Sequence, residues 1–139
     1  MSYEGTLTLK TVEGTGLRFE ARFGEWSYDI DSGPGASAAS PVMALLGSLA
    51  SCEAMDVLSI LRKKRLQILG YEVSMRGDRA GEHPKRYTHI EIVHRLTGRG
   101  LPPAAVAEAI ALSEQKYCSV RHSLRTDLEV VNRFELIEG

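Results

Sequence analysis

The chain has 139 residues, of which 43% are hydrophobic and 25% are charged, and its formal net charge is −1. This length and composition are typical of one globular domain and exclude an intrinsically disordered chain. The near-neutral charge gives no reason to expect nucleic acid or an anionic membrane as a partner.

The first ten residues, MSYEGTLTLK, contain no basic region followed by an apolar core, so no signal peptide is expected. No stretch of about 18 uncharged apolar residues occurs, and we therefore expect no membrane span. Both features favour a cytoplasmic protein. In that reducing compartment a permanent structural disulfide is disfavoured, whereas a catalytic or redox-active disulfide is not.

Hydrophobic and polar residues alternate through residues 1–31, in three runs separated by the glycine-containing turns EGTG and FGE. Alternation with period two, broken by glycine turns, predicts a three-stranded antiparallel meander. The residues expected on the apolar faces of these strands are Leu7, Leu9, Leu17, Phe19, Ala21, Phe23, Trp26, Tyr28 and Ile30.

A long central helix is predicted for residues 40–65. Ser40 suits the N-cap position because its hydroxyl can accept a backbone hydrogen bond, and Pro41 suits the first helical position, where no donor is needed. The first half of this segment, VMALLGSLASC, is apolar or small on every side. That composition predicts a helix buried all round.

The remaining segments complete an α+β order. Residues 67–98 alternate as two strands joined by the polar loop AGEHPK, and residues 101–118 have the apolar spacing of a second helix. Residues 126–137 are typical of a final strand. The order βββ-α-ββ-α-β predicts one α+β domain over residues 1–139, with a largely antiparallel sheet.

The two cysteines carry the functional signal. Cys52 lies in the central helix among small residues that leave space beside its sulfur, and Glu53 follows it. Cys118 lies near the end of the second helix, close to Arg121 and His122, which could stabilise a thiolate. From the residues alone, the pair could be inert core cysteines, part of a metal site, a hydrolytic nucleophile or a redox pair.

Metal binding and hydrolysis are the weaker interpretations. Structural zinc sites use closely spaced cysteine or histidine ligands, and Cys52 has none within thirty residues on either side. No GxSxG nucleophile motif is present. We therefore expect no metal and no cofactor. A two-cysteine redox centre fits better, because neighbouring helices can bring the Cα atoms of distant cysteines to roughly 4.4–6.8 Å.

Two stretches resemble a known family. The run SPVMALLGSLASCEAMDVLSILRKKR is similar to the central helix of the osmotically inducible and organic hydroperoxide resistance (OsmC/Ohr) proteins. The run RYTHIEIVHRLTGRGLPPAAVAEAIALSEQKYCSV is similar to their second half. The resemblance covers nearly the whole chain and is strongest to the YhfA-like branch of the family.

This resemblance implies an OsmC-like fold, in which antiparallel sheets from two chains wrap two central helices as an intertwined homodimer. It also implies a stress-response peroxidase with its site at the subunit interface. Cys52 would attack an organic hydroperoxide, and Cys118 would then form a disulfide with the oxidised Cys52. A dithiol reductant would restore both thiols.

The chain departs from the family pattern at the start of the central helix. Peroxidase members carry a glutamate there, which pairs with an arginine and stabilises the thiolate, whereas this chain has Val42 and Met43. Arg18 is the expected arginine partner, and Glu53 and Arg121 are the expected substitutes. The missing carboxylate favours an alternative function, a non-catalytic dimer that binds a small molecule or senses thiol reagents. A purely structural dimer is the third interpretation.

Overall fold

The structure is a computed structural model that describes residues 1–139. The chain packs as two compact units, residues 1–45 and residues 46–139. Helix α1 (Pro41–Lys63) begins in the first unit and continues through the second. The single domain expected over residues 1–139 stays a prediction.

The first unit contains a three-stranded antiparallel sheet in the order β1-β2-β3. Its strands are β1 (Thr6–Leu9), β2 (Phe19–Phe23) and β3 (Trp26–Ile30). The register places Leu7 beside Ala21 and Ala21 beside Tyr28, so the alternating apolar residues share one face. The meander expected within residues 1–31 is therefore present.

Helix α1 begins as its sequence predicts. The Ser40 hydroxyl oxygen accepts a hydrogen bond from the Met43 backbone N–H at 3.2 Å, which is an N-cap interaction. Arg62 and Lys63 lie in the last turn, where cations complement the helix dipole.

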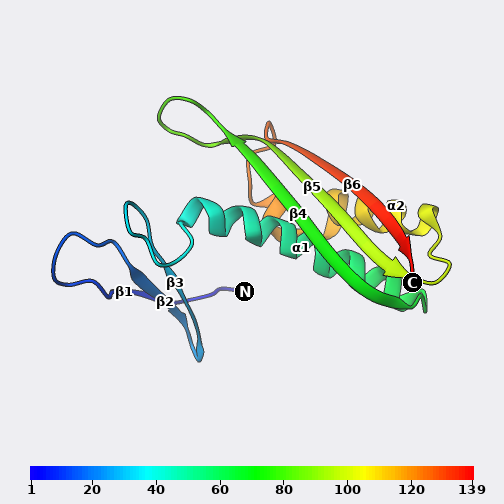
Figure 1. Cartoon of the computed structure of the whole chain (residues 1–139), viewed down its shortest axis with the longest axis horizontal. Helices are drawn as coiled ribbons and strands as arrows, with labels where there is room; N and C mark the ends of the chain where they lie inside the picture. Colours follow the sequence, from blue (N-terminus) through cyan, green and yellow to red (C-terminus); the bar gives the residue numbers. More distant parts are fainter. The chain divides into compact units, whose positions relative to one another are not determined.

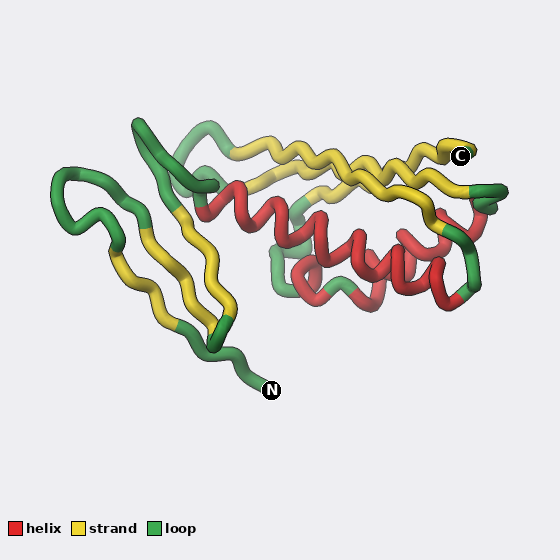
Figure 2. The backbone as a smooth tube through the Cα atoms, turned by 60° about the horizontal axis from the view of Figure 1, so that its bottom comes forward, coloured by secondary structure: helices red, strands yellow, loops and turns green.

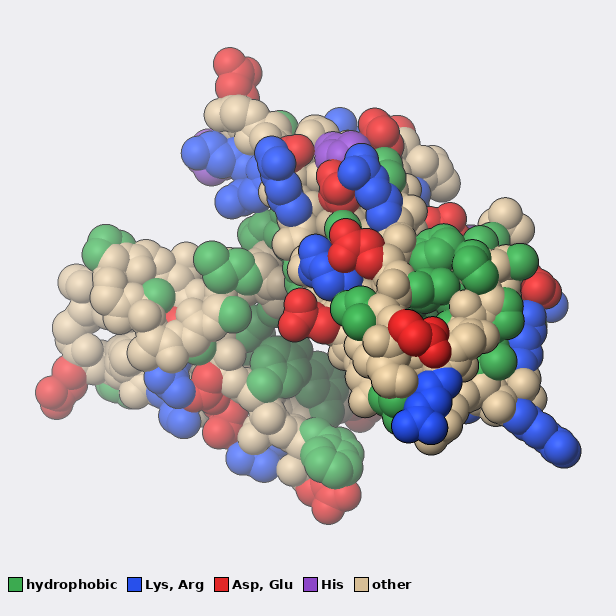
Figure 3. Space-filling view, turned by 45° about the vertical axis from the view of Figure 1, so that its right-hand side comes forward, with side chains coloured by type: hydrophobic (Ala, Val, Ile, Leu, Met, Phe, Trp, Pro, Cys, Tyr) green, Lys and Arg blue, Asp and Glu red, His purple; other side chains and the backbone are tan.

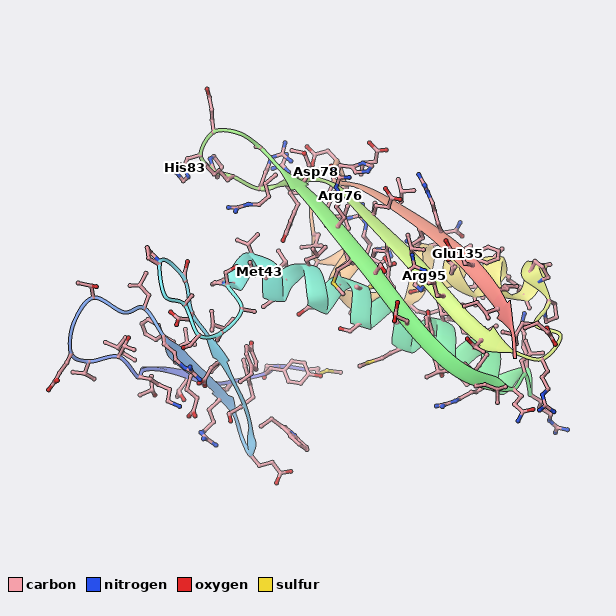
Figure 4. All side chains as sticks on the ribbon, viewed as in Figure 1. Met43, Arg76, Asp78, His83, Arg95 and Glu135 are labelled. Atoms are coloured by element: carbon pink, nitrogen blue, oxygen red, sulfur yellow. The ribbon has the colours of Figure 1, made fainter.

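Only one face of α1 is buried. The buried residues are Leu49, Ala50, Glu53, Val57 and Leu61, and from Ala50 onward they recur every three or four positions. The prediction that the first half is buried on every side is wrong for the single chain, because Ser48 and Ser51 are exposed. Met43, in the first turn, is 64% exposed (Figure 4). A helix packed against one layer of structure can bury one face only.

Helix α1 also has the length and hydropathy of a membrane span. It carries two carboxylates, Glu53 and Asp56, in its middle, where charged groups would be costly in a bilayer. Core helices of water-soluble proteins meet the same criteria, so α1 is weak evidence for a membrane.

The second unit contains a sheet in the order β4-β5-β6 (Figure 1). Its strands are β4 (Ile68–Arg79), β5 (Tyr87–Gly98) and β6 (Glu129–Glu138). Strands β4 and β5 pair antiparallel, as predicted, but β5 and β6 pair parallel, from His89 beside Glu129 to Gly98 beside Glu138. The expectation of an antiparallel sheet is wrong for this pair. The segment between β5 and β6 is a long helical crossover, which returns the chain to the end of the sheet where β5 began.

The crossover contains α2 (Pro103–Leu112), the π-helical turn η1 (Ser113–Tyr117) and α3 (Ser119–His122). The continuous helix expected for residues 101–118 is therefore interrupted. The Cys118 backbone N–H bonds to the Ser113 carbonyl at 2.9 Å, which is the wider i→i−5 spacing of a π turn. Cys118 itself is extended, with φ −72° and ψ 99°, and ends the helix.

The hydrophobic core of the second unit lies between this sheet and its helices, which cover one face of the sheet (Figure 2). One cluster joins α1, β5 and α2 through Val57, Leu61, Leu96, Leu101, Val106, Ala109 and Ile110. A second cluster consists of Leu49, Ala50, Ile90, Ile92, Cys118 and Leu128. The second cluster therefore packs Cys118 against α1 and β5.

The opposite face of the sheet is polar. Arg95 on β5 pairs with Glu135 on β6 at 3.0 Å, and Arg76 pairs with Asp78 at 3.3 Å on β4 (Figure 4). A space-filling view shows acidic and basic side chains interspersed over the surface that it displays (Figure 3). One face apolar and one face charged is the alternation expected for residues 67–98.

Leu96 lies fully buried in the first cluster, so truncating it tests the packing. We expect Leu96→Ala to lower the free energy of unfolding by about 2–5 kcal/mol, the range for leucine-to-alanine changes that leave a cavity. Leu69→Ala is the matched control, because Leu69 is 49% exposed, and it should change that free energy by less than about 1 kcal/mol. Urea titration followed by circular dichroism measures both. Equal effects would contradict the placement of Leu96.

Candidate functional site

Cys52, Asp56 and Cys118 meet at one point in the second unit. The two sulfur atoms and an Asp56 carboxylate oxygen all lie within 4.8 Å of one another. Cys52 and Asp56 are four residues apart on α1 and so lie on the same side of the helix. Cys118 directly follows η1. The crossover thus brings together two cysteines that are far apart in the sequence.

The two cysteines differ in burial. Both are free thiols; Cys52 is half-buried and Cys118 is fully buried. The Cys118 sulfur accepts a hydrogen bond from the Arg121 backbone N–H at 3.3 Å. Burial raises the pKa of Cys118 above its usual range, the Arg121 amide opposes this rise, and the adjacent Cys52 and Glu53 reinforce it. Cys118 is therefore a neutral thiol near pH 7.

Glu53 is an unpartnered acid in the core. Neither of its carboxylate oxygens has a hydrogen-bond partner, although the residue is only 1% exposed. Burial raises the pKa of Glu53 to about 7, and the carboxylates of Glu114 and Asp56 reinforce the rise, whereas the nearby Asn132 amide and Arg121 charge oppose it. As a carboxylate Glu53 disfavours a thiolate beside it, so it can support one only in its protonated form.

Asp56 is held in place by the π turn. The Ser113 hydroxyl donates a hydrogen bond to Asp56 Oδ2 at 2.8 Å, and Ser113 is itself fully buried. The break between α2 and η1 falls at this serine. The Asp56 carboxylate is consequently oriented by a second element, and its position beside the sulfur atoms does not depend on α1 alone.

A chain of polar side chains crosses the otherwise apolar inner face of the sheet. The Tyr71 hydroxyl donates to His94 Nδ1 at 2.7 Å, and His94 Nε2–H donates to Asn132 Oδ1 at 2.8 Å. The Asn132 amide in turn donates to the Glu114 carboxylate. Burial lowers the pKa of His94, so the ring is neutral, and this bonding order places its proton on Nε2.

Neither the motifs nor the spacing of the sequence predicts a role for Asp56, for Ser113 or for this polar chain. One signal was available, because the alternation places His94 on the same strand face as Ile92 and Leu96. A histidine on an apolar face needs buried partners for both ring nitrogens.

Arg121, one of the predicted thiolate-stabilising residues, lies beside Cys118. Its guanidinium donates to the backbone carbonyls of Arg125 and Leu128, each at 2.9 Å. The hydrogen bond that it makes to the Cys118 sulfur comes from its backbone. A groove of about 220 Å³ opens at this point and is lined by Glu114, Arg121, His122, Leu124 and Thr126.

Arg18, the other predicted arginine, belongs to the first unit. Its Nε donates to Asp29 Oδ2 at 2.7 Å, and it also donates to the Ser37 hydroxyl. The Arg18 guanidinium in turn holds the pKa of Asp29 below its usual range. A role for Arg18 as the partner of the Cys52 thiolate stays a prediction.

Comparison with known proteins identifies the family. Residues 33–131 match the family model described as OsmC-like protein. The chain belongs to the OsmC-like family. It is 36% identical to protein YhfA of Escherichia coli strain K12 over 129 residues, which are 93% of this chain and 96% of YhfA.

Solved structures share this OsmC-like fold. That of a hypothetical protein from Aquifex aeolicus VF5 matches with a TM-score of 0.87 at 26% identity, covering 100% of this chain and 98% of that one. The organic hydroperoxide resistance protein OhrB of Bacillus subtilis matches with a TM-score of 0.63 at 11% identity, covering 97% and 98%. The second likeness is one of fold alone. Together these matches confirm the predicted α+β, OsmC-like fold.

The raised pKa of Glu53 makes stability depend on pH. The unfolded chain releases this proton near pH 4.5 and the folded chain near pH 7, so the folded state binds more protons between these values. The free energy of unfolding should therefore fall as the pH rises through this window. Glu53→Gln removes the titrating group and should remove this part of the fall, up to about 3 kcal/mol.

Urea titrations in metal-free buffer at several pH values measure this effect. The matched control is Glu82→Gln, because Glu82 lies exposed in the loop between β4 and β5 and should leave the pH profile unchanged. A Glu53→Gln profile that parallels the wild-type profile would show that Glu53 ionises alike in both states.

Proposed function

We propose that this chain is a thiol-dependent peroxidase that reduces organic hydroperoxides, with Cys52 as the attacking residue and Cys118 as the resolving residue. The observation that carries the proposal is the position of the two sulfur atoms, which lie within 4.8 Å of each other. Membership in the OsmC-like family supports it, as does a fold shared with organic hydroperoxide resistance proteins. The wider context would be a stress response.

The proposed reaction has two oxidative steps. The Cys52 thiolate attacks the terminal oxygen of the hydroperoxide, the O–O bond breaks, and Cys52 becomes a sulfenic acid while the alkoxide takes a proton and leaves as the alcohol. The Cys118 sulfur then attacks the sulfenic sulfur, so that a disulfide and water form. A dithiol reductant returns two electrons and two protons and restores both thiols.

Burial supports this order of the two cysteines. The attacking cysteine must be reached by substrate, and Cys52 is half-buried whereas Cys118 is fully buried. The resolving cysteine meets only the neighbouring sulfenic acid. Its raised pKa is compatible with that role, since the thiol proton of Cys118 leaves with the sulfenic hydroxyl as water.

Stabilisation of the Cys52 thiolate is the demanding part of this mechanism, because Val42 and Met43 replace the carboxylate at the helix start. Arg18, Arg121 and protonated Glu53 are the groups that we assign to it. Arg121 lies beside Cys118, but its guanidinium also donates hydrogen bonds to two backbone carbonyls. We therefore expect a peroxidase slower than those family members that have the helix-start glutamate.

The test follows both thiols by mass spectrometry after reduced protein is mixed with a bulky organic hydroperoxide. We expect one Cys52–Cys118 disulfide per chain, formed much faster than a free thiol reacts, and more slowly with hydrogen peroxide. Cys52→Ser should abolish the reaction. Cys118→Ser should leave a sulfenic acid on Cys52, which a dimedone label traps.

Ser119→Ala is the matched control, because Ser119 is exposed beside Cys118 and should leave the rate unchanged. A rate no better than that of a free thiol in the wild-type chain would overturn the peroxidase.

A separate observation favours a second function, a non-catalytic dimer that binds a small molecule or senses thiol reagents. The apolar face of the first sheet forms a pocket of about 770 Å³, whose lining includes Leu7, Leu17, Phe19, Phe23, Tyr28 and Ile30. A mostly apolar pocket of this size suits a small hydrophobic ligand. Thiols that persist unchanged under organic hydroperoxide would favour this function.

We further propose that the chain is a cytoplasmic homodimer. Large apolar side chains outside this pocket are exposed in each unit, among them Trp26, at 74%, in the first and Met55, at 69%, in the second. Apolar surface of this extent typically marks an interface. A second copy of the chain would also cover the outer face of α1, which the chain itself leaves exposed.

Light scattering after size exclusion tests the dimer. We expect twice the 15.3 kDa mass of the chain. Trp26→Glu combined with Met55→Glu should shift the protein towards the monomer, because each change buries a charge in the proposed interface. Arg76→Glu on the charged face of β4 is the control. A wild-type mass of one chain would contradict the dimer.

A further inference from the structure

The cysteine pair has a third neighbour that peroxide chemistry does not use. Asp56 places a carboxylate oxygen within 4.8 Å of both the Cys52 and the Cys118 sulfur atoms. Two thiolates and one carboxylate are ligands that Zn²⁺ accepts, with Zn–S near 2.3 Å and Zn–O about 2.0–2.2 Å. Tetrahedral geometry then puts the two sulfurs about 3.8 Å apart. The observed spacing reaches this arrangement through small side-chain movements.

We propose that reduced Cys52 and Cys118, together with Asp56, bind one thiophilic divalent cation of the Zn²⁺ type. The sequence alone predicts no metal site, because Cys52 has no cysteine or histidine nearby in the chain. In the folded chain, two segments that are distant in the sequence supply the ligands. Helix α1 provides Cys52 and Asp56 one turn apart, and Cys118 directly follows η1.

The surroundings of Asp56 are those of a metal ligand. Carboxylates that bind metals are usually held by a hydrogen bond from a second residue, and the buried Ser113 hydroxyl donates to Asp56 Oδ2 at 2.8 Å. This bond leaves the other carboxylate oxygen, and the remaining lone pair of Oδ2, for a cation. Three protein ligands leave a fourth tetrahedral position open, as in zinc sites that exchange a ligand.

Binding is an exchange of protons for metal. Each thiol loses its proton to solvent as its sulfur binds, so one divalent cation releases two protons, and no electron moves. A Cys52–Cys118 disulfide has no thiolate to offer, so the oxidised chain should not bind. The inference needs only reduced thiols, and it stands or falls independently of the proposed peroxidase activity.

Titration of reduced, chelator-stripped full-length protein with Co²⁺ tests the site, followed by displacement with Zn²⁺. We expect one Co²⁺ per chain, with thiolate-to-cobalt charge-transfer absorption and the strong visible bands of a tetrahedral ion. Cys52→Ser and Cys118→Ser should each abolish tight binding. Prior oxidation of the pair with diamide should abolish it as well.

Two further variants test the carboxylate. Asp56→Asn should weaken binding at least about tenfold, and Ser113→Ala, which leaves all three ligands in place, should weaken it by about 10–100-fold. The matched control is Asp78→Asn on the exposed face of β4, which should bind as the wild type does. Circular dichroism without metal checks that each variant is folded.

Three results would overturn the inference. One is the absence of Co²⁺ binding by the reduced chain, and another is binding that survives Cys118→Ser. The third is binding that depends on both cysteines but is equally tight in Asp56→Asn, Ser113→Ala and Asp78→Asn, because Asp56 would then be no ligand.

Discussion

The packing of one face of α1 against the sheet is the constraint on which the second unit depends. Leu49, Glu53, Val57 and Leu61 are spaced by four residues, so they follow one another along a single side of the helix. Three of them are aliphatic and pack in the core. The fourth, Glu53, lies in the same core because it occupies the same side of the helix. Cys52, one position earlier, is then turned to the flank of the buried face, where it is half-buried.

Together with burial, the carboxylate of Glu53 raises the pKa of its neighbours Cys118 and Tyr71. The Glu53 oxygens make no hydrogen bond of ordinary geometry, and burial raises the pKa of Glu53 to about 7 against an opposing effect of the nearby Asn132 amide. A fold selected for stability alone would replace such a group with an apolar residue of similar volume, since an unsatisfied polar group in the core is destabilising. Its presence beside two cysteines is a feature of this core that packing alone does not explain.

The polar chain from Tyr71 to Glu114 extends the same arrangement across the sheet. Three strands each contribute one member, and every hydrogen bond joins residues that are distant in the sequence. Asn132 is the last strand residue of the polar chain. Its amide donates a hydrogen bond to the Glu114 carboxylate and also lowers the pKa of Glu53, against the effect of burial. The sheet therefore does more than support the helices, because it sets the electrostatic surroundings of the site.

The features that could be predicted from the sequence are those that depend on local periodicity. Alternation identifies the strands within residues 1–31 and 67–98, and the serine and proline at the start of α1 identify its N-cap. The direction of β6 could not be found this way, because a strand has the same alternation in either direction. The π turn also leaves no mark on the pattern of residues 101–118, since it adds one residue per turn without changing composition. The proximity of Asp56 to Cys118 depends on how α1 packs against the crossover, which no local pattern reveals.

The charge around the cysteine pair differs between its states. Without a cation, the Glu53 carboxylate opposes the formation of a Cys118 thiolate, since like charges in a poorly solvated site repel. A divalent cation bound by both sulfurs and Asp56 would favour the thiolate form of both cysteines, because its two positive charges offset the two thiolate charges. In the disulfide no thiolate exists, so the oxidised pair offers a cation no charged sulfur ligand. Oxidation and metal binding would therefore compete for the same two sulfur atoms.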